Sequence, residues 1–248
     1  MPESWCNALM KYKYEVNLAN YPNAQKFPIY FNQHISGDRD STINFEYYFR
    51  KKCSIEIEPW FEVVFWKMYS QGKFIRDSQT NTIIQRFFNK VSPSSLLEAA
   101  KKFMECKNNE EAKRAFILYQ KKFYAGDSIA TVATFPSFLD PQNFPMVDTR
   151  VAKWVTIYYS KFNSFTNDEP KLIPSPSAEA TKPSDLNEKW KFNLNINSDF
   201  EFYWRWILWT REYAQKLNTY NTGFTWRSRD VEMAVFTEGW NRSKLNPL

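Results

Sequence analysis

Few residue types in this chain could do chemistry, because it has one histidine and three scattered cysteines. With His34 as the only histidine, a histidine metal centre or a Ser-His-Asp triad is not expected. Cys6, Cys53 and Cys106 form neither a disulfide framework nor a paired-cysteine metal motif. Catalysis would therefore come from carboxylates, lysine, tyrosine or serine, and we expect no metal and no cofactor.

Asp148 is the best-placed carboxylate of the chain. It lies in the run PMVDTRV at residues 145–151, where an expected helix begins and continues to Tyr158. An aspartate at this position is a common N-cap, and the field of the helix favours its ionised form. Asp148 therefore has two interpretations, a helix cap and a catalytic carboxylate, and both can hold.

The elements that must position Asp148 are expected to be helices. Only 5 glycines occur, which argues against an all-β fold rich in tight turns. Apolar residues recur at three- and four-residue spacing, which is typical of amphipathic helices. The helices predicted in this way cover 59–71, 80–89, 93–103, 109–123, 127–135, 148–159, 198–217 and a last segment from Ser228.

Several helix ends carry recognisable signals. Ser92 is predicted to be an N-cap followed by Pro93 as the first helical residue, and Asn108 or Asn109 to cap the next helix. Pro136 is expected to stop the helix that starts at residue 127.

A turn is expected after that helix, at Asp140-Pro141-Gln142-Asn143. Ser198 is the expected cap of a long aromatic helix. The aromatic stripe of this helix is expected to serve mostly in core packing, and its members are Phe202, Trp206, Trp209 and Tyr213.

These patterns predict a mostly α-helical protein with four segments. Residues 1–54 are expected to form an irregular arm that packs on a second lobe, and 55–163 a helical domain. Residues 164–190 are rich in proline and polar residues, which is typical of an exposed insertion or linker. Residues 191–248 are expected to supply the helices that complete the fold.

The charge and the hydropathy pattern bear on partners and location. A net charge of +6 favours a polyanionic partner. No run of about 18 apolar residues is present, so no membrane span is expected. The first residues also lack the basic and then apolar pattern of a secretory signal, so we expect an intracellular protein of the cytoplasm or nucleoid.

Residues 109–162 contain two informative runs, YAGDSIA at 124–130 and PMVDTRV at 145–151. In this stretch the chain resembles the helix-hairpin-helix DNA glycosylase superfamily, which includes endonuclease-III-like and archaeal 8-oxoguanine glycosylases. The first run lies where that family has its hairpin, and the second resembles the signature around its catalytic aspartate. Ser70-Gln71 matches a serine-glutamine pair at a helix end, and WRSRDVEMA at 226–234 resembles a C-terminal helix of some members. The resemblance implies a two-lobed helical fold with a helix-hairpin-helix.

The resemblance also implies a base-excision activity on double-stranded DNA that contains an oxidised or deaminated base. Asp148 would stabilise the cationic sugar and orient a water, Gln71 would fill the gap left by the flipped base, and Gly126, Asp127 and Ser128 would hold phosphate. Further phosphate contacts are expected from Lys121, Lys122, Arg150 and Lys153. Stacking on the flipped base is expected from Trp66 and Phe144.

Two departures from the family pattern narrow the expected chemistry. Phe123-Tyr124 replace the first proline-glycine pair of the hairpin, so only Gly126 of its glycines is present. Ser128 occupies the position of the Schiff-base lysine found in bifunctional members, and serine cannot form an imine with the sugar. We therefore expect a monofunctional, monomeric glycosylase that acts by hydrolysis.

Two other functions remain open from the sequence. The chain could be a nucleic-acid-binding module that retains the scaffold without the activity, which the incomplete hairpin favours. It could also be a helical protein-interaction domain, with Gln71 as an ordinary helix end, Ser128 as a helix cap and the lysines as a solvated surface. The run Asp38-Arg39-Asp40 is interpreted as a solvated turn rather than a metal site, since no third ligand is placed near it.

Overall fold

The computed structural model describes residues 2–12, 38–57, 59–60, 63, 92–122, 129–147, 151 and 196–245. Within these residues every regular element is a helix and none is a strand, which confirms the predicted α-helical class. The chain divides into two compact units, described separately below. The C-terminal unit is Met1–Tyr12 with Asp140–Leu248, and the central unit is Lys13–Leu139.

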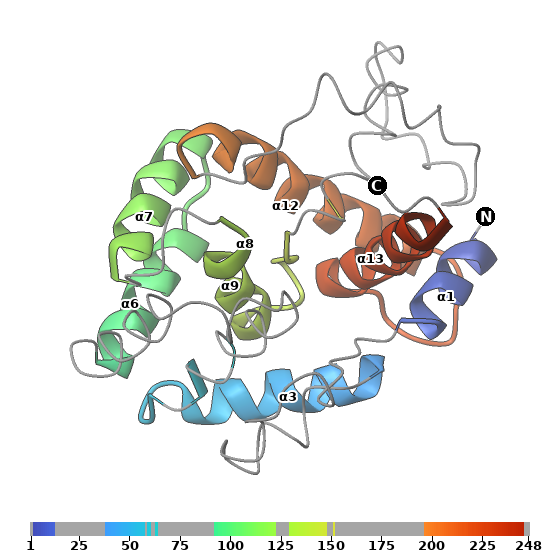
Figure 1. Ribbon diagram of the computed structural model, residues 1–248, viewed down its shortest axis with the longest axis horizontal. Helices are drawn as coiled ribbons and strands as arrows, with labels where there is room; N and C mark the ends of the chain where they lie inside the picture. The colour runs from blue at the N-terminus through green and yellow to red at the C-terminus, as the bar shows by residue number, and fades with distance from the viewer. Residues whose placement is uncertain are drawn as a thin grey trace. The chain divides into compact units, whose positions relative to one another are not determined.

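In the central unit, α6 (Pro93–Met104) and α7 (Asn109–Lys122) lie side by side (Figure 1). Their buried faces meet at Phe103 and Phe116, whose ring centroids are 4.8 Å apart. The predicted start of α6 is confirmed, because the Ser92 hydroxyl accepts a hydrogen bond from the Ser95 N–H and proline occupies the first turn. Asn108 caps α7 in the same way, through the N–H of Glu111.

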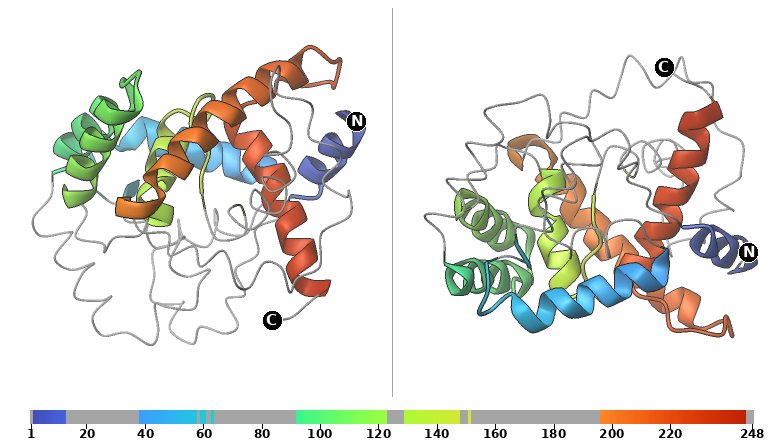
Figure 2. Two further views of the ribbon diagram at one scale, coloured as in Figure 1. Left: turned by 90° about the horizontal axis from the view of Figure 1, so that it is seen from above. Right: turned by 60° about the horizontal axis from the view of Figure 1, so that its bottom comes forward.

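A second pair of helices in this unit is α3 (Arg39–Lys52) and α9 (Thr134–Leu139) (Figure 2). The rings of Phe45 and Phe49 both pack on Phe138, with centroids 5.2 and 5.9 Å away. Arg50 donates from Nη1 to the Phe138 carbonyl over 3.1 Å, which satisfies a carbonyl at the end of α9. Aromatic packing and one long-range hydrogen bond thus hold α9 on α3.

The predicted helix over 127–135 is wrong at its end. The chain forms α8 (Ile129–Val132), turns at Ala133 and starts again as α9, so that Pro136 lies inside a helix. Proline is tolerated there because it is the third residue of α9, where a backbone N–H has no partner within the helix. Pro136 therefore belongs to the beginning of a helix and not to the end of one.

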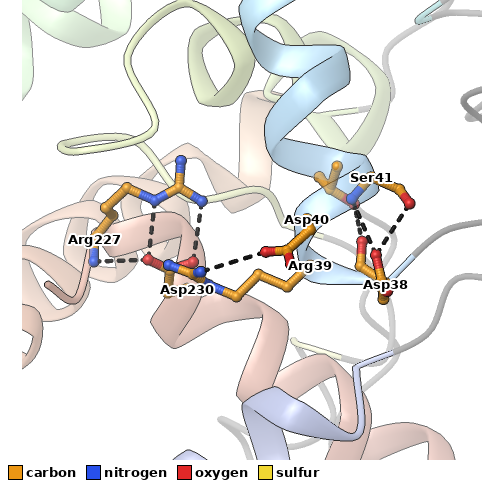
Figure 3. A network of polar contacts seen from close by, with 7 residues as sticks. Asp38, Arg39, Asp40, Ser41, Arg227 and Asp230 are labelled. Atoms are coloured by element: carbon orange, nitrogen blue, oxygen red, sulfur yellow. Dashed lines mark hydrogen bonds and ion pairs between the residues drawn. The ribbon is translucent and has the colours of Figure 1, made fainter. Parts of the chain in front are cut away.

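The expectation of an irregular arm is also wrong for its described parts. Residues 2–10 form α1 (Pro2–Met10), and α3 begins at Arg39 with Asp38 as its cap. The Asp38 carboxylate accepts hydrogen bonds from the N–H and the hydroxyl of Ser41 (Figure 3). Asp38 is thus a helix cap rather than part of a free turn, and these contacts lower the pKa of its carboxyl group.

In the C-terminal unit, α13 (Ser228–Leu245) packs on both α1 and α12 (Ile196–Asn218) (Figure 1). The first contact includes Tyr12 and Phe236, whose ring centroids are 5.9 Å apart. The predicted start of α13 at Ser228 is confirmed, whereas α12 begins two residues before the Ser198 cap that was expected. Ser198 is therefore the third residue of α12 and not its N-cap.

The turn between α12 and α13 folds back on the end of α12. Asn218 forms two hydrogen bonds with the backbone of Trp226, one through its amide nitrogen and one through its amide oxygen. Gly223 has a φ of 81°, a left-handed backbone that glycine adopts without strain. This turn delivers Arg227 to the start of α13, where it forms three hydrogen bonds with the buried carboxylate of Asp230 (Figure 3).

Candidate active-site segment

Most of the predicted site residues lie outside the described residues: Asp148, Gln71, Gly126, Asp127, Ser128, Arg150, Lys153 and Trp66. The structure describes Lys121 and Lys122, which are the exposed last two residues of α7. It also describes Phe144, which lies in the segment that leads to Asp148. The site is therefore built here from the residues that flank Asp148 and hold its neighbours.

Residues 140–147, which we call the anchored segment, end directly before Asp148 and belong to the C-terminal unit. The segment begins with a turn in which the Asp140 carbonyl accepts hydrogen bonds from the N–H groups of Asn143 and Phe144. The Asp140 carboxylate also accepts from the Asn143 side chain over 2.8 Å. This confirms the predicted turn after Asp140 and fixes the direction in which the chain leaves it.

Side chains of α12 hold three carbonyl oxygens of the anchored segment. The indole of Trp206 donates to Met146 over 2.8 Å, and Arg211 donates from Nε to Asn143 over 2.8 Å. The hydroxyl of Tyr203 lies 3.5 Å from the Pro145 carbonyl. Burial raises the pKa of Tyr203 well above its usual range, so the hydroxyl stays neutral and can act as a donor.

The start of α13 holds two more carbonyls of the same segment. The N–H groups of Ser228 and Arg229 donate to Gln142 and Pro141 over 3.2 and 3.0 Å. Backbone N–H groups at a helix start have no partner within their own helix, so the anchored segment serves as the cap of α13. These bonds also use the amides that would otherwise be available to an anion at this helix start.

Apolar side chains complete the anchoring on both sides of Asp148. Phe144, Met146 and Val147 are buried, and beyond Asp148 the helical residue Val151 is fully buried. The candidate catalytic carboxylate thus follows a stretch of chain held by five carbonyl hydrogen bonds and by core packing.

Phe144 and Arg211 form a cation–π pair at the edge of this unit. The guanidinium carbon of Arg211 lies 4.7 Å from the centre of the Phe144 ring, and the ring is only 2 % exposed. Burial lowers the pKa of Arg211, while the nearby Asp140 acts in the opposite direction, and a guanidinium remains charged at neutral pH. The role of Phe144 in stacking on a base stays a prediction. Such stacking would require Arg211 either to leave the ring or to lie between the ring and the base.

The predicted hairpin lies between two described helices of the central unit. α7 ends at Lys122 and α8 begins at Ile129, and residues 123–128 between them lie outside the described residues. Lys122 is close enough to Glu98 of α6 to contribute to the lowered pKa of that carboxyl group, after the larger effect of Lys102. The predicted phosphate contact of Lys122 stays a prediction.

The sequence reasoning missed Arg211 and the hydrogen-bonding role of Trp206. Trp206 was predicted only as part of an aromatic stripe, and its ring does stack on Trp209 at 5.1 Å. Its indole N–H has a hydrogen-bond partner because a buried donor requires one. A tryptophan that is expected in the core therefore predicts such a partner from the sequence. Arg211 carries no such signal, since an arginine on a helix is normally a surface residue.

Two absences hold for the described part of the chain. No group of three or more histidine, cysteine, aspartate or glutamate residues there is arranged to hold a metal ion. No helix in the same residues combines the length and the apolar character that crossing a membrane requires.

No model of a known protein family, no curated protein and no solved structure matches the chain.

Proposed function

We propose that this protein is a monofunctional DNA N-glycosylase, which flips a damaged base out of the duplex and hydrolyses its bond to the sugar. The proposal assigns the hydrolysis to Asp148, and Gln71 fills the gap that the flipped base leaves in the duplex. The phosphate contacts come from 126–128 and the adjacent Lys121 and Lys122. The overall arrangement would be the two-lobed helix-hairpin-helix fold that the sequence resembles.

The observation that carries the proposal is the anchoring of residues 140–147. Hydrolysis of an N-glycosidic bond builds positive charge on the sugar, so it needs a carboxylate fixed close to one position. Hydrogen bonds from Tyr203, Trp206 and Arg211, together with the start of α13, restrain the chain up to the residue before Asp148.

The expected mechanism follows from the residue types. The ionised carboxylate of Asp148 stabilises the developing cation and orients a water for attack on the sugar. Ser128 cannot form an imine with the sugar, so the product is an abasic site in an intact strand. The excess of positive charge in the chain supports binding to the phosphate backbone.

The test is base release from a panel of duplexes that each carry one lesion: 8-oxoguanine, uracil, 5-hydroxyuracil, 5-hydroxymethyluracil or hypoxanthine. Alkali treatment converts the abasic sites into strand breaks, so cleavage with alkali and none without it is the expected result. Asp148→Asn should abolish the cleavage. The matched control is Asp40→Asn, which removes one carboxylate that is 85 % exposed on the surface of α3.

The outcomes distinguish the proposal from its alternatives. Salt-sensitive DNA binding without cleavage on any duplex would favour a binding module that lacks the activity. Strand breaks without alkali would contradict the monofunctional assignment. Absence of DNA binding even at low salt would leave the helical protein-interaction domain.

A further inference from the structure

Arg211 of α12 contacts the anchored segment in two ways. It donates from Nε to the Asn143 carbonyl over 2.8 Å, and its guanidinium lies 4.7 Å from the centre of the adjacent Phe144 ring. The Arg211 side chain thus holds two consecutive residues of the segment, Asn143 through its backbone carbonyl and Phe144 through its ring. The other α12 contacts, those of Tyr203 and Trp206, each hold a single carbonyl.

The position of Arg211 differs from that of the other arginine in the described part of α12. Arg205 is exposed, whereas Arg211 is half-buried. An arginine used only for charge would stay in water, because burial of a guanidinium costs solvation free energy. Both of its described contacts are directed at residues 143–144, four to five residues before the candidate catalytic carboxylate.

From this geometry we infer that Arg211 is a positioning residue for Asp148, which acts by clamping Asn143 and Phe144. The inference rests on the proposed glycosylase function. Arg211 holds the start of the buried run 144–147, while Trp206 holds its end through Met146. Since a displacement of about 1 Å at a reacting group can slow a reaction roughly a hundredfold, loss of the clamp should act on the rate of base release and not on DNA affinity.

The test compares three variants by single-turnover base release and by equilibrium binding to the same duplex. Arg211→Met removes the hydrogen bond and the charge while it keeps the length of the side chain. Arg211→Lys retains a cation over the Phe144 ring and one possible donor, so it should recover part of the rate. Arg205→Met is the matched control, since it removes the same charge from an exposed position of the same helix.

The expected result is a fall in the rate of about a hundredfold for Arg211→Met, with the same Kd as for Arg205→Met. An unchanged rate would overturn the inference. A weakened Kd with an unchanged rate would also overturn it, because Arg211 would then be a phosphate contact. Failure of Arg211→Lys to recover any of the rate lost in Arg211→Met would exclude the cation over Phe144 as part of the clamp.

A second measurement separates this inference from the proposed function. The N–H of Phe144 is bonded to the Asp140 carbonyl, so hydrogen exchange at this amide reports on the segment in the free protein. Arg211→Met should accelerate its exchange, and Arg205→Met should not. If the wild-type chain releases no base, the proposed function is contradicted, and so is the catalytic role of the Arg211 clamp. Unchanged exchange at Phe144 shows instead that Arg211 does not clamp the segment.

Discussion

The indole nitrogen of Trp206 donates a hydrogen bond to the carbonyl oxygen of Met146 over 2.8 Å, between residues that are 60 positions apart in the sequence. Both residues are buried, so water does not replace this bond when it is broken. The bond joins the middle of α12 to the chain two residues before Asp148. It thereby couples the packing of the long helix to the segment that precedes the candidate catalytic residue.

Trp206→Phe tests this coupling directly. The variant leaves the Met146 carbonyl buried without its donor, which should lower the free energy of unfolding by about 1–3 kcal/mol. Urea unfolding followed by circular dichroism measures the change. Trp204→Phe is the control, because it removes a buried indole of the same helix that has no described hydrogen bond to residues 140–147. An equal loss in both variants would mean that packing alone accounts for the effect.

The ion pair between Arg227 and Asp230 should contribute far more than the pair between Arg39 and Asp40 (Figure 3). Asp230 is fully buried and accepts three hydrogen bonds from Arg227, so Asp230→Asn should cost on the order of 3–5 kcal/mol. Asp40 is 85 % exposed, and Asp40→Asn should change stability by less than about 1 kcal/mol. Urea midpoints of the two variants test the contrast. A loss of similar size in both would contradict the assigned burial.

α1 should stabilise the C-terminal unit through Trp5. This side chain is fully buried with its ring centroid 4.7 Å from that of Tyr213, so Trp5→Ala should lower the free energy of unfolding by about 3–5 kcal/mol. Met10→Ala on the same helix is the control, because Met10 is 74 % exposed and its loss should have little effect. Thermal unfolding of both variants measures the difference. Equal midpoints would show that α1 is not held by this contact.

Cys53 should make stability fall at alkaline pH. Burial raises the pKa of its thiol to about 11, above the ordinary thiol value of 9.0 that applies when the chain is unfolded. The unfolded state therefore loses the proton first, so the contribution is complete below pH 9 and is lost as the pH rises through about 11.

The measurement for Cys53 is urea unfolding between about pH 8 and 11, in the wild type and in Cys53→Ala. The alanine variant removes this titration and leaves the tyrosines in place, so its stability should depend less on pH over the window. If stability depends on pH in the same way in the two proteins, the pKa of the Cys53 thiol is not raised.

Side chains that act locally made parts of the fold predictable. Ser92 and Asn108 cap the helices they were predicted to cap, because a capping side chain and its N–H partner lie three residues apart. Asp140 likewise formed its predicted turn. These interactions are complete within a few residues, so the sequence contains all of their determinants.

Features that depend on distant residues were less predictable. α1 was missed although Trp5, Ala8, Leu9 and Tyr12 have helical spacing, because the run is short and its partners are in α13 and α12. The sequence predicts a helix end at Pro136, yet the preceding break at Ala133 makes Pro136 part of the first turn of α9. Arg211 meets Asn143 from 68 residues away, and no local pattern marks such a contact.

The central claim is that Asp148 hydrolyses the bond between a damaged base and its sugar. Single-turnover base release from the lesion duplexes, with wild type and Asp148→Asn compared at equal saturation with DNA, tests it most directly. We predict alkali-sensitive cleavage of at least one duplex by the wild type, and none by Asp148→Asn although its Kd for that duplex is retained. Equal rates for the two proteins would contradict the claim.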